Sequence, residues 1–449
     1  MSNKYLIDFG LIPLDVINLV INEHENVDFI VEDKFKYQRG VKYGLNTSRF
    51  FLTPCLNAKG DYRFYDYNIV QNILMDYKTL QLFDRTESVF HTISSKIRKI
   101  SSKIEAAIKL IKSNNYTDLI FTATPHNCNN WILAKVAEYL GCKVHYFKQS
   151  VIPWRYSLYT GLSMNAKINH VFEEIDNDEV TEINDFLDKK RGGLEEALPD
   201  YEKKRILNNK GKLYSIRREI NYINRPDLLF NKLFCWIKYN KLSVSPELSD
   251  KYIVFFLHFQ PERTTLPEGY GFTQQVLAIK ALRKNTPKDI KLYVKEHPST
   301  FTNHCHWKEK DTSFYEEIAN IEGVYLVDIN FDQYKMIDKS IAVGSITGTV
   351  LFESIVRNVP SIAFGLSPYI QSEIHHKFKD EISLKNFINR IYENSHSDCF
   401  YVMDSLTNTF SVKKHSFIAL QPGTNDNHIA AAIGIMKILD NKFSFSVNK

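Results

Sequence analysis

Short apolar runs of strand length alternate along the chain with stretches in which apolar residues recur every three or four positions. The runs are typical of buried strands, and the longer spacing is typical of one helix face. Strand–helix–strand alternation predicts parallel sheets with helices on their faces, so we expect an α/β fold. In the N-terminal half the predicted strands are residues 5–9, 27–31, 118–122 and 144–147, with helices near 15–22 and 131–140.

The alternation restarts near residue 250, after an intervening segment of different character. From about residue 173 onward the charge density rises, and strand patterns give way to polar helical sequence such as residues 202–208 and 213–220. We therefore predict an N-terminal α/β domain over residues 1–245, including a helical insertion and linker at about 173–245, and a second α/β domain over 246–449. In the second domain the predicted strands are residues 252–257, 290–294, 324–327, 340–343 and 361–364, with helices at 272–282 and 349–356.

One predicted helix of the N-terminal half carries a regular stripe of isoleucines, with lysines and arginines on its other faces. This pattern describes a basic amphipathic helix. We expect it to pack on the domain core, and a helix on a membrane surface is the alternative. The isoleucines of the stripe are Ile93, Ile97, Ile100, Ile104, Ile108 and Ile111.

Composition and charge limit the classes of protein to consider. Of the 449 residues, 44% are hydrophobic and 24% are charged, which is ordinary for a soluble protein of two domains. The formal net charge of +5 is small for this length, so binding to nucleic acid is not expected. A signal-peptide pattern and a run of about 18 apolar residues are both missing, so we expect a cytoplasmic protein without a membrane span. Peripheral contact with the inner face of the cytoplasmic membrane stays open.

Cysteine spacing argues against disulfides and against a metal centre. The six cysteines are far apart and form no paired spacings, so we expect reduced thiols. One cluster, His304-Cys305-His306, combines residue types that bind metals. Adjacent residues rarely converge on one ion, and no second ligand pair is evident. We therefore expect neither a metal site nor a cofactor.

Three polar segments directly follow predicted strands of the second domain. Open α/β sheets bind ligands at the carboxyl ends of their strands, so these segments form the candidate site. The first, His258-Phe259-Gln260-Pro261-Glu262-Arg263-Thr264-Thr265, follows strand 252–257. Glu262 can accept hydrogen bonds from sugar hydroxyls or act as a base, and Arg263 can pair with a carboxylate or phosphate. An exposed loop with a Glu–Arg pair is the alternative.

The other two segments combine positive charge with a helix start. In Lys295-Glu296-His297-Pro298-Ser299, a lysine and a histidine can meet a nucleotide phosphate, and Pro298 fixes the turn. Gly344-Ser345-Ile346-Thr347-Gly348-Thr349 leads into a helix that carries Glu353, within reach of a ribose hydroxyl. A helix start presents N–H groups to an anion, although Ser and Thr are also favoured there as caps.

Together these segments resemble a known family. "HFQPERTT", "LYVKEHPS" and "GSITGTVLFESIVRNVPSIAFG" agree in order and spacing with the capsule polysaccharide biosynthesis family, which includes the Kdo transferases of capsule assembly, over roughly 110 residues. The resemblance implies a GT-B architecture, in which two Rossmann-like domains face each other across a cleft, and a CMP-activated donor. It places the CMP phosphate against Lys295, His297, Ser345, Thr347 and Thr349, and the ribose near Glu353. The full set of candidate donor-binding residues is His258, Arg263, Lys295, His297, Pro298, Ser345, Thr347, Gly348, Thr349 and Glu353.

The N-terminal half resembles the family less closely. In "FTATPHNCNNWILAKVAEYLGCKVHYFKQS" a Pro-His pair follows a strand and precedes a helix, which implies that His126 faces the cleft near the acceptor and takes part in catalysis. Relatives often have acids soon after this pair, where this chain has Asn127, Asn129 and Asn130. A carboxylate nucleophile in this domain is therefore not supported. A helix-capping or core histidine is the alternative for His126.

The resemblance implies a glycosyltransferase that moves an ulosonic or nonulosonic acid, Kdo-like or sialic-acid-like, from a CMP-activated donor to a glycan, glycolipid or glycoprotein acceptor. Such transfer needs orientation, neutralisation of the departing phosphate and a carboxylate as base or nucleophile. We expect Glu262 to be this carboxylate and Arg263 to pair with the carboxylate of the donor. The alternatives are a CDP-polyol phosphotransferase of the teichoic-acid type, a UDP-sugar enzyme of GT-B architecture, and a non-catalytic subunit of a polysaccharide assembly complex.

Overall fold

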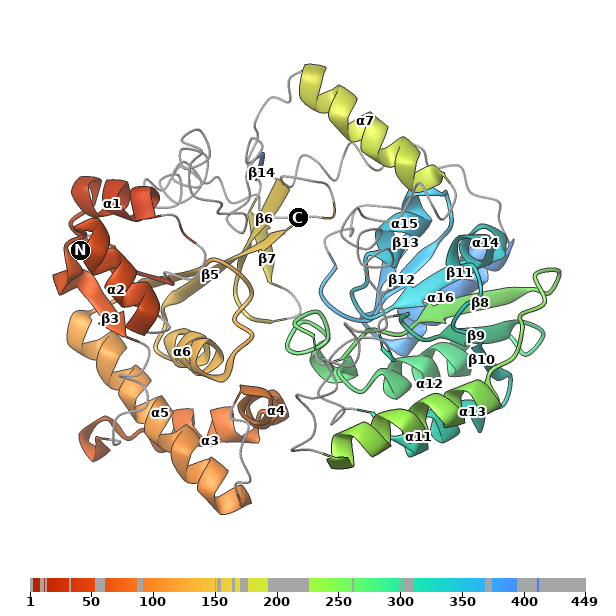
Figure 1. The fold of residues 1–449 in the computed structure, drawn as a ribbon, viewed down its shortest axis with the longest axis horizontal. Helices are drawn as coiled ribbons and strands as arrows, with labels where there is room; N and C mark the ends of the chain where they lie inside the picture. The colour runs from red at the N-terminus through yellow and green to blue at the C-terminus, as the bar shows by residue number, and fades with distance from the viewer. Residues whose placement is uncertain are drawn as a thin grey trace. The chain divides into compact units, whose positions relative to one another are not determined.

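The chain divides into two compact units, each built on its own sheet. Unit 1 comprises residues 1–174 with 406–449, and unit 2 comprises residues 175–405. Figure 1 shows the ribbon of the computed structural model. The structure describes residues 3–8, 12, 14–31, 34–52, 61–86, 92–149, 151, 155–163, 166–169, 177–192, 226–260, 262–298, 300–301, 310–367, 374–393 and 410–411.

The sheet of unit 1 has the strand order β14-β6-β5-β4-β1-β2-β3, with β7 paired to β6. Strands β1 to β5 are parallel, and β6, β7 and β14 pair antiparallel. Every residue of β1, β2 and β4 is buried, as expected for a sheet covered by helices on both faces. The strands are β1 (Tyr5–Asp8), β2 (Val27–Val31), β3 (Phe50–Leu52), β4 (Asp118–Phe121), β5 (Lys143–Gln149), β6 (Arg155–Thr160), β7 (Lys167–Asn169) and β14 (Phe410–Ser411).

The helices of unit 1 include the isoleucine-rich one, which packs on the core as predicted. In α5 the side chains of Ile100, Ile104 and Ile108 are fully buried, and only the first turns expose isoleucines, at Ile93 and Ile97. The membrane-surface alternative for this stripe is therefore not needed. The helices are α1 (Leu14–Glu23), α2 (Lys34–Tyr43), α3 (Tyr67–Met75), α4 (Tyr77–Thr86), α5 (Ile93–Asn114) and α6 (Cys128–Tyr139).

The sheet of unit 2 has the strand order β10-β9-β8-β11-β12-β13, and all its strands are parallel. The strands are β8 (Tyr252–Phe256), β9 (Lys291–Lys295), β10 (Val324–Val327), β11 (Ala342–Ser345), β12 (Ser361–Ala363) and β13 (His375–Lys377). The helices are α7 (Asn177–Arg191), α11 (Pro226–Leu242), α12 (Gln275–Asn285), α13 (Thr312–Ala319), α14 (Gln333–Lys339), α15 (Val350–Val356) and α16 (Glu381–Glu393).

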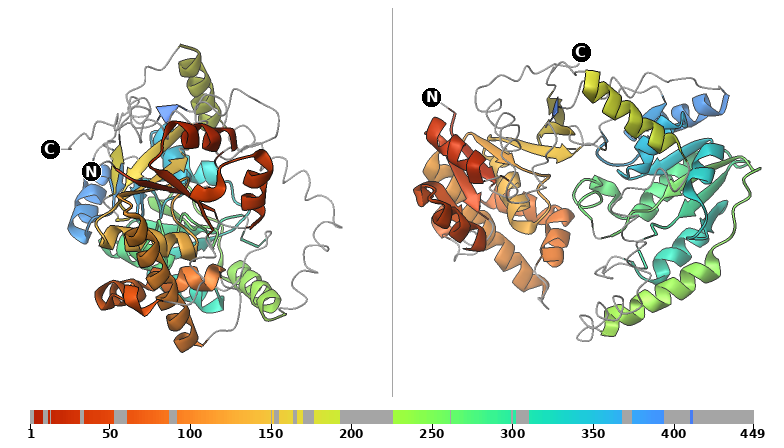
Figure 2. Two further views of the ribbon diagram at one scale, coloured as in Figure 1. Left: turned by 90° about the vertical axis from the view of Figure 1, so that its left-hand side faces the viewer. Right: turned by 45° about the horizontal axis from the view of Figure 1, so that its top comes forward.

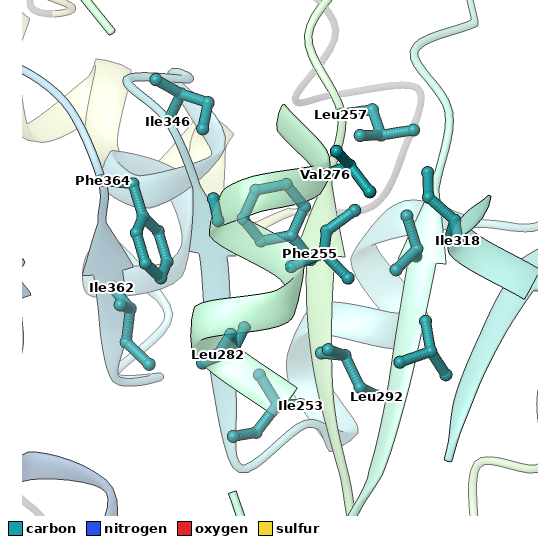
Figure 3. Close-up of a cluster of buried hydrophobic side chains, with 14 of the residues drawn as sticks. Ile253, Phe255, Leu257, Val276, Leu282, Leu292, Ile318, Ile346, Ile362 and Phe364 are labelled. Carbon is teal, nitrogen blue, oxygen red and sulfur yellow. The ribbon is translucent and has the colours of Figure 1, made fainter. Parts of the chain in front are cut away.

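Alternate residues of β8 enter separate cores on the two faces of this sheet. Ile253 and Phe255 belong to the larger cluster, which includes side chains of α11, α12, α13 and α16. Figure 3 shows both residues with other members of this cluster. Tyr252, Val254 and Phe256 belong to the smaller cluster, together with side chains of α14. Because successive side chains of a strand point to opposite faces, a continuous apolar run such as YIVFF fits a strand buried on both sides.

The predicted α/β class, with two parallel-dominated sheets, is confirmed. Helices α7 and α11 lie inside the segment predicted to be a helical insertion, and both belong to unit 2. The other helical patterns of that segment, at 202–208 and 213–220, lie outside the described residues. Strand β14 pairs with β6, so this part of the C-terminal stretch lies with unit 1, whereas the sequence assigned residues 246–449 to the second domain.

Candidate functional site

Polar side chains gather at the carboxyl ends of β8, β9 and β11 in unit 2. From β8 the chain continues to β9 and β10 on one side, then returns to β11, β12 and β13 on the other. The edge between β8 and β11 is therefore the topological switch point, where open α/β sheets bind ligands. The three segments predicted from sequence all start at the carboxyl ends of these strands.

His258 connects the loop after β8 to the loop after β11. Its Nε2 accepts a hydrogen bond from the backbone N–H of Thr347 at 3.0 Å. Because a backbone N–H can only donate, Nε2 carries no proton, and the proton of the neutral ring lies on Nδ1. The backbone is fixed as well: the N–H of His258 donates to Oε1 of Gln275 at 2.6 Å, and Nζ of Lys310 donates to the carbonyl oxygen of His258 at 3.0 Å. The orientation of this buried ring is therefore set before any ligand binds.

Glu262 lies next to the protonated nitrogen of His258. Nδ1 of His258 is 3.3 Å from Oγ1 of Thr264 and 3.8 Å from Oε2 of Glu262, and the Thr264 hydroxyl donates to the same carboxylate oxygen at 2.8 Å. Partial burial raises the pKa of Glu262, but the contacts with His258 and Thr264 outweigh it and leave that pKa below its ordinary value. The Glu262 side chain is 39% exposed, so an ionised carboxylate is open to a ligand.

His297 follows β9 and lies close enough to Glu262 for the two to affect each other's titration. Burial lowers the pKa of His297 to about 4, and the negative charge of Glu262 opposes this shift without cancelling it. The ring is therefore neutral near pH 7. Its centroid is 6.1 Å from that of Phe259, and Pro298, the next residue, is exposed. A neutral imidazole at a strand exit can donate or accept a hydrogen bond, and it supplies no charge until an anion raises its pKa.

A buried ion pair beneath these residues was not predicted from the sequence. Glu296 has a side chain with no exposed surface, and its two oxygens accept hydrogen bonds from Lys310 Nζ at 2.8 and 2.9 Å. Tyr315 and Thr300 donate to the same carboxylate at 2.7 and 3.0 Å. The backbone N–H of His297 also donates to it, at 2.8 Å. Lys310 thus joins the loops after β8 and β9. The only sequence signal for Glu296 was its place between two candidate residues.

The loop after β11 uses most of its polar groups within the fold. The hydroxyl of Ser345 donates to the carbonyl of Phe256 at 3.0 Å, and the hydroxyl of Thr347 donates to the carbonyl of Thr264 at 2.7 Å. A Cβ at Gly348 would lie 2.9 Å from Oγ of Ser345 and 3.5 Å from Nε2 of His258, so this close approach requires glycine. Thr349 is exposed. The predicted phosphate contacts of these residues stay predictions.

Three other candidates have protein partners in the structure. Nζ of Lys295 donates to the carbonyls of Ile329 and Asp328 at 2.6 and 3.4 Å, and burial lowers the pKa of this lysine to about 8. Arg263 lies 3.4 Å from the fully buried carboxylate of Glu268. Glu353 pairs at 2.9 Å with Lys190 of α7. These contacts give each residue a structural role, and their predicted roles toward phosphate, donor carboxylate and ribose have no support among the described contacts.

The corresponding edge of unit 1 lies between β1 and β4, where the strand order also reverses. Asp8, the last residue of β1, is buried, and its Oδ2 accepts a hydrogen bond from the Thr122 hydroxyl at 3.2 Å. His126 has Nδ1 2.8 Å from the carbonyl of Thr124, so that nitrogen carries the proton. Asn127 caps α6 by accepting from the N–H of Asn130 at 2.8 Å. The sequence did not single out Asp8, although an acid at the end of an apolar run is a recognisable signal.

Within the described ranges, no group of three or more His, Cys, Asp or Glu residues has the arrangement of a metal site. The cluster His304-Cys305-His306 lies outside the described residues. Cys128, Cys142 and Cys235 are free thiols.

Comparison with known proteins gives weak similarities only. No model of a protein family matches the sequence, and no curated protein matches it. Among solved structures, the β-Kdo 2,7 transferase KpsC of Thermosulfurimonas dismutans is 10% identical, covers 81% of this chain and 96% of its own, and gives a TM-score of 0.32. The UDP-GlcNAc 2-epimerase of Methanocaldococcus jannaschii is 11% identical, covers 98% and 100%, and gives a TM-score of 0.22. Similarities at these TM-scores carry no inference about activity, so we base the proposal on the side chains of the site.

Proposed function

We propose that this chain is a glycosyltransferase of GT-B architecture whose unit 2 binds the nucleotide of an activated sugar donor. The observation that carries the proposal is the set of bonded side chains at the switch point, where His258, Glu262 and Thr264 connect to the loop after β11. His297 is near enough for the charge of Glu262 to affect its pKa. Nucleotide-binding α/β domains use this same edge. The fold holds these side chains in place before a ligand binds, so little free energy of binding is spent on ordering them.

The chemistry requires a carboxylate and a group that meets the leaving phosphate. Transfer breaks the bond between the anomeric carbon and the phosphate oxygen, and it forms a bond from that carbon to the acceptor oxygen, whose proton leaves. A carboxylate with a lowered pKa is a weak base, so Glu262 suits attack on the electron-poor anomeric carbon, or its stabilisation, better than proton removal. His297 is the candidate for the phosphate, because an anion beside the ring raises its pKa and makes the hydrogen bond charge-assisted. For His126 of unit 1, a catalytic role near the acceptor rests on the sequence resemblance alone.

The finer proposal, a CMP-activated ulosonic or nonulosonic acid as donor, rests on the sequence resemblance to the capsule polysaccharide family. Its acceptor would be a glycan, glycolipid or glycoprotein, and the reaction needs no metal or other cofactor. Arg263 would bind the carboxylate of the donor. The guanidinium of Arg263 already lies beside the carboxylate of Glu268, and its side chain is partly exposed. The carboxylate of the donor would therefore bind to Arg263 as a second carboxylate, in addition to Glu268.

A thermal-shift series with CMP, CDP, UDP and GDP tests the nucleotide. The sequence resemblance implies a CMP-activated donor, so we expect CMP to raise the melting temperature most. A ligand at about 100 times its Kd adds roughly 2.7 kcal/mol to the free energy of unfolding. A preference for UDP would move the chain to the UDP-sugar enzymes, and a preference for CDP would favour the polyol phosphotransferase. Stabilisation by CMP without CMP release from any CMP-sugar and acceptor would favour a non-catalytic subunit.

A substitution of His297 tests whether the nucleotide binds at this edge. His297→Ala removes one hydrogen bond to the phosphate, and we expect CMP affinity to fall by about 5- to 150-fold with the melting temperature retained. The matched control is His376→Ala. His376 lies in the same unit, on the outermost strand β13, and burial also lowers its pKa to about 4. Calorimetric titration of CMP into both variants separates the outcomes, and an equal loss in the two would assign His297 a structural role only.

A further inference from the structure

Helix α11 has apolar side chains on two opposite faces. On one face Leu228, Cys235 and Tyr239 are buried in the larger core of unit 2. The hydroxyl of Tyr239 donates to the carbonyl of Val327 and accepts the N–H of Glu296, so this face also supports the candidate site. Figures 1 and 2 show α11 beside α13 at the edge of unit 2. The position of the helix is therefore fixed by its buried face.

The opposite face carries six large apolar side chains that are between 39% and 56% exposed. At about 100° per residue they form one continuous arc of roughly 160° around the helix. Within it the rings of Phe230 and Phe234 stack with centroids 6.4 Å apart. Exposed apolar groups this dense mark an interaction surface rather than ordinary scatter. We call this surface the α11 apolar face, and its residues are Leu229, Phe230, Leu233, Phe234, Trp236 and Ile237.

Lysines border the α11 apolar face. At the same angle per residue, Lys232 and Lys238 fall at its two edges, and Lys241 lies in the last turn. Lys238 pairs with Glu316 of α13. The only acid in the helix is Asp227, in the first turn. An apolar face with aromatic side chains and flanking lysines is the pattern of helices that lie in the interface of a bilayer with anionic headgroups.

We propose that the α11 apolar face binds the surface of an anionic lipid bilayer, with the helix lying in the plane of the interface. No helix of the described chain is long and apolar enough to cross a membrane, and the buried face of α11 keeps it attached to unit 2. A symmetric contact between two copies through this face would bring like-charged lysines together, which favours the lipid as occupant. This role goes beyond the proposed transfer reaction and does not depend on it.

Co-sedimentation of the full chain with vesicles tests the proposal. We compare phosphatidylcholine vesicles with vesicles that also contain phosphatidylglycerol, and the wild type with Phe230→Ser/Phe234→Ser. The matched control is Tyr62→Ser/Tyr65→Ser, which removes two exposed aromatic rings from unit 1. We expect the α11 double variant to lower the bound fraction at least about tenfold and the control to leave it unchanged. Lys232→Gln/Lys241→Gln should reduce the preference for phosphatidylglycerol. The phenylalanine and tyrosine double variants should keep the wild-type melting temperature, because the changed side chains are exposed.

The fluorescence of Trp236 gives a second readout. The difference in emission between the wild type and Trp236→Phe isolates this indole, and we expect it to shift to shorter wavelength on vesicles containing phosphatidylglycerol. Equal vesicle binding by the wild type and Phe230→Ser/Phe234→Ser would overturn the proposal. So would a dimer in solution that this double variant dissociates, since the occupant would then be a second copy. A wild type that binds neither kind of vesicle would also overturn it and indicate that another part of the chain covers the face.

Discussion

Replacement of Lys310 by methionine should destabilise unit 2 far more than the loss of an ordinary lysine. The change removes the two hydrogen bonds to Glu296, at 2.8 and 2.9 Å, and the one to the carbonyl of His258, at 3.0 Å. Both side chains of the pair are almost fully buried, with 3% of Lys310 and none of Glu296 exposed. The variant therefore leaves a carboxylate in the interior without its counter-ion. Breaking a buried pair in this way costs about 3–5 kcal/mol.

Urea-induced unfolding measures this cost against a matched control. Lys284→Met removes a lysine whose Nζ is 2.6 Å from Glu381, but those side chains are 67% and 49% exposed, so its loss should cost about 0–1 kcal/mol. The double variant Lys310→Met/Glu296→Gln removes the uncompensated charge, so it should lose less stability than the sum of the two single variants. If Lys310→Met loses no more stability than Lys284→Met, or if the double variant equals the sum, the ion pair does not support the site as argued.

Three further predictions concern individual titratable groups. Glu262→Gln should lower the rate of CMP release in the presence of acceptor by at least roughly 10²-fold with nucleotide affinity nearly unchanged; a normal rate would place the catalytic carboxylate elsewhere. The pKa of His297 is about 4, and a bound phosphate raises it, so CMP binding should take up a proton and tighten as pH falls from 7 towards 5. Calorimetry in buffers of different ionisation enthalpy measures this uptake, and affinity independent of pH would exclude a protonated, charge-assisted contact of His297 with the phosphate. Burial lowers the pKa of His375 from 6.5 to about 3, so between these pH values the unfolded state binds a proton that the folded state does not. The free energy of unfolding should therefore fall by about 2 kcal/mol as the pH drops from above 6.5 to about 5. In His375→Gln this decrease in the free energy of unfolding below pH 6.5 should be absent. A decrease equal to that of the wild type would show that His375 is not its cause.

The position of the candidate site could be predicted from the sequence, but the contacts between its side chains could not. A polar segment after an apolar strand is visible in the printed chain, and parallel strands bring their carboxyl ends to one edge. His258, Glu262 and His297 were placed at this edge on that basis, and the structure brings them together there. The sequence does not show which way a side chain turns at the end of a strand. Lys295 was grouped with His297 for this reason, and it turns instead towards the carbonyls of Asp328 and Ile329.

What the sequence determined by itself is the class of each element and the faces that it buries. Apolar spacing is local, so strands β2 and β10 were predicted with their observed bounds, and the isoleucine stripe of α5 was correctly assigned to the core. The partners of buried polar groups are not local. Glu296 meets Lys310, and Asp8 meets Thr122, only after the sheets have formed, because separate segments must first reach one edge. Helix α11 shows the same limit: its sequence is apolar nearly all round, and only packing decided which face is buried and which stays exposed.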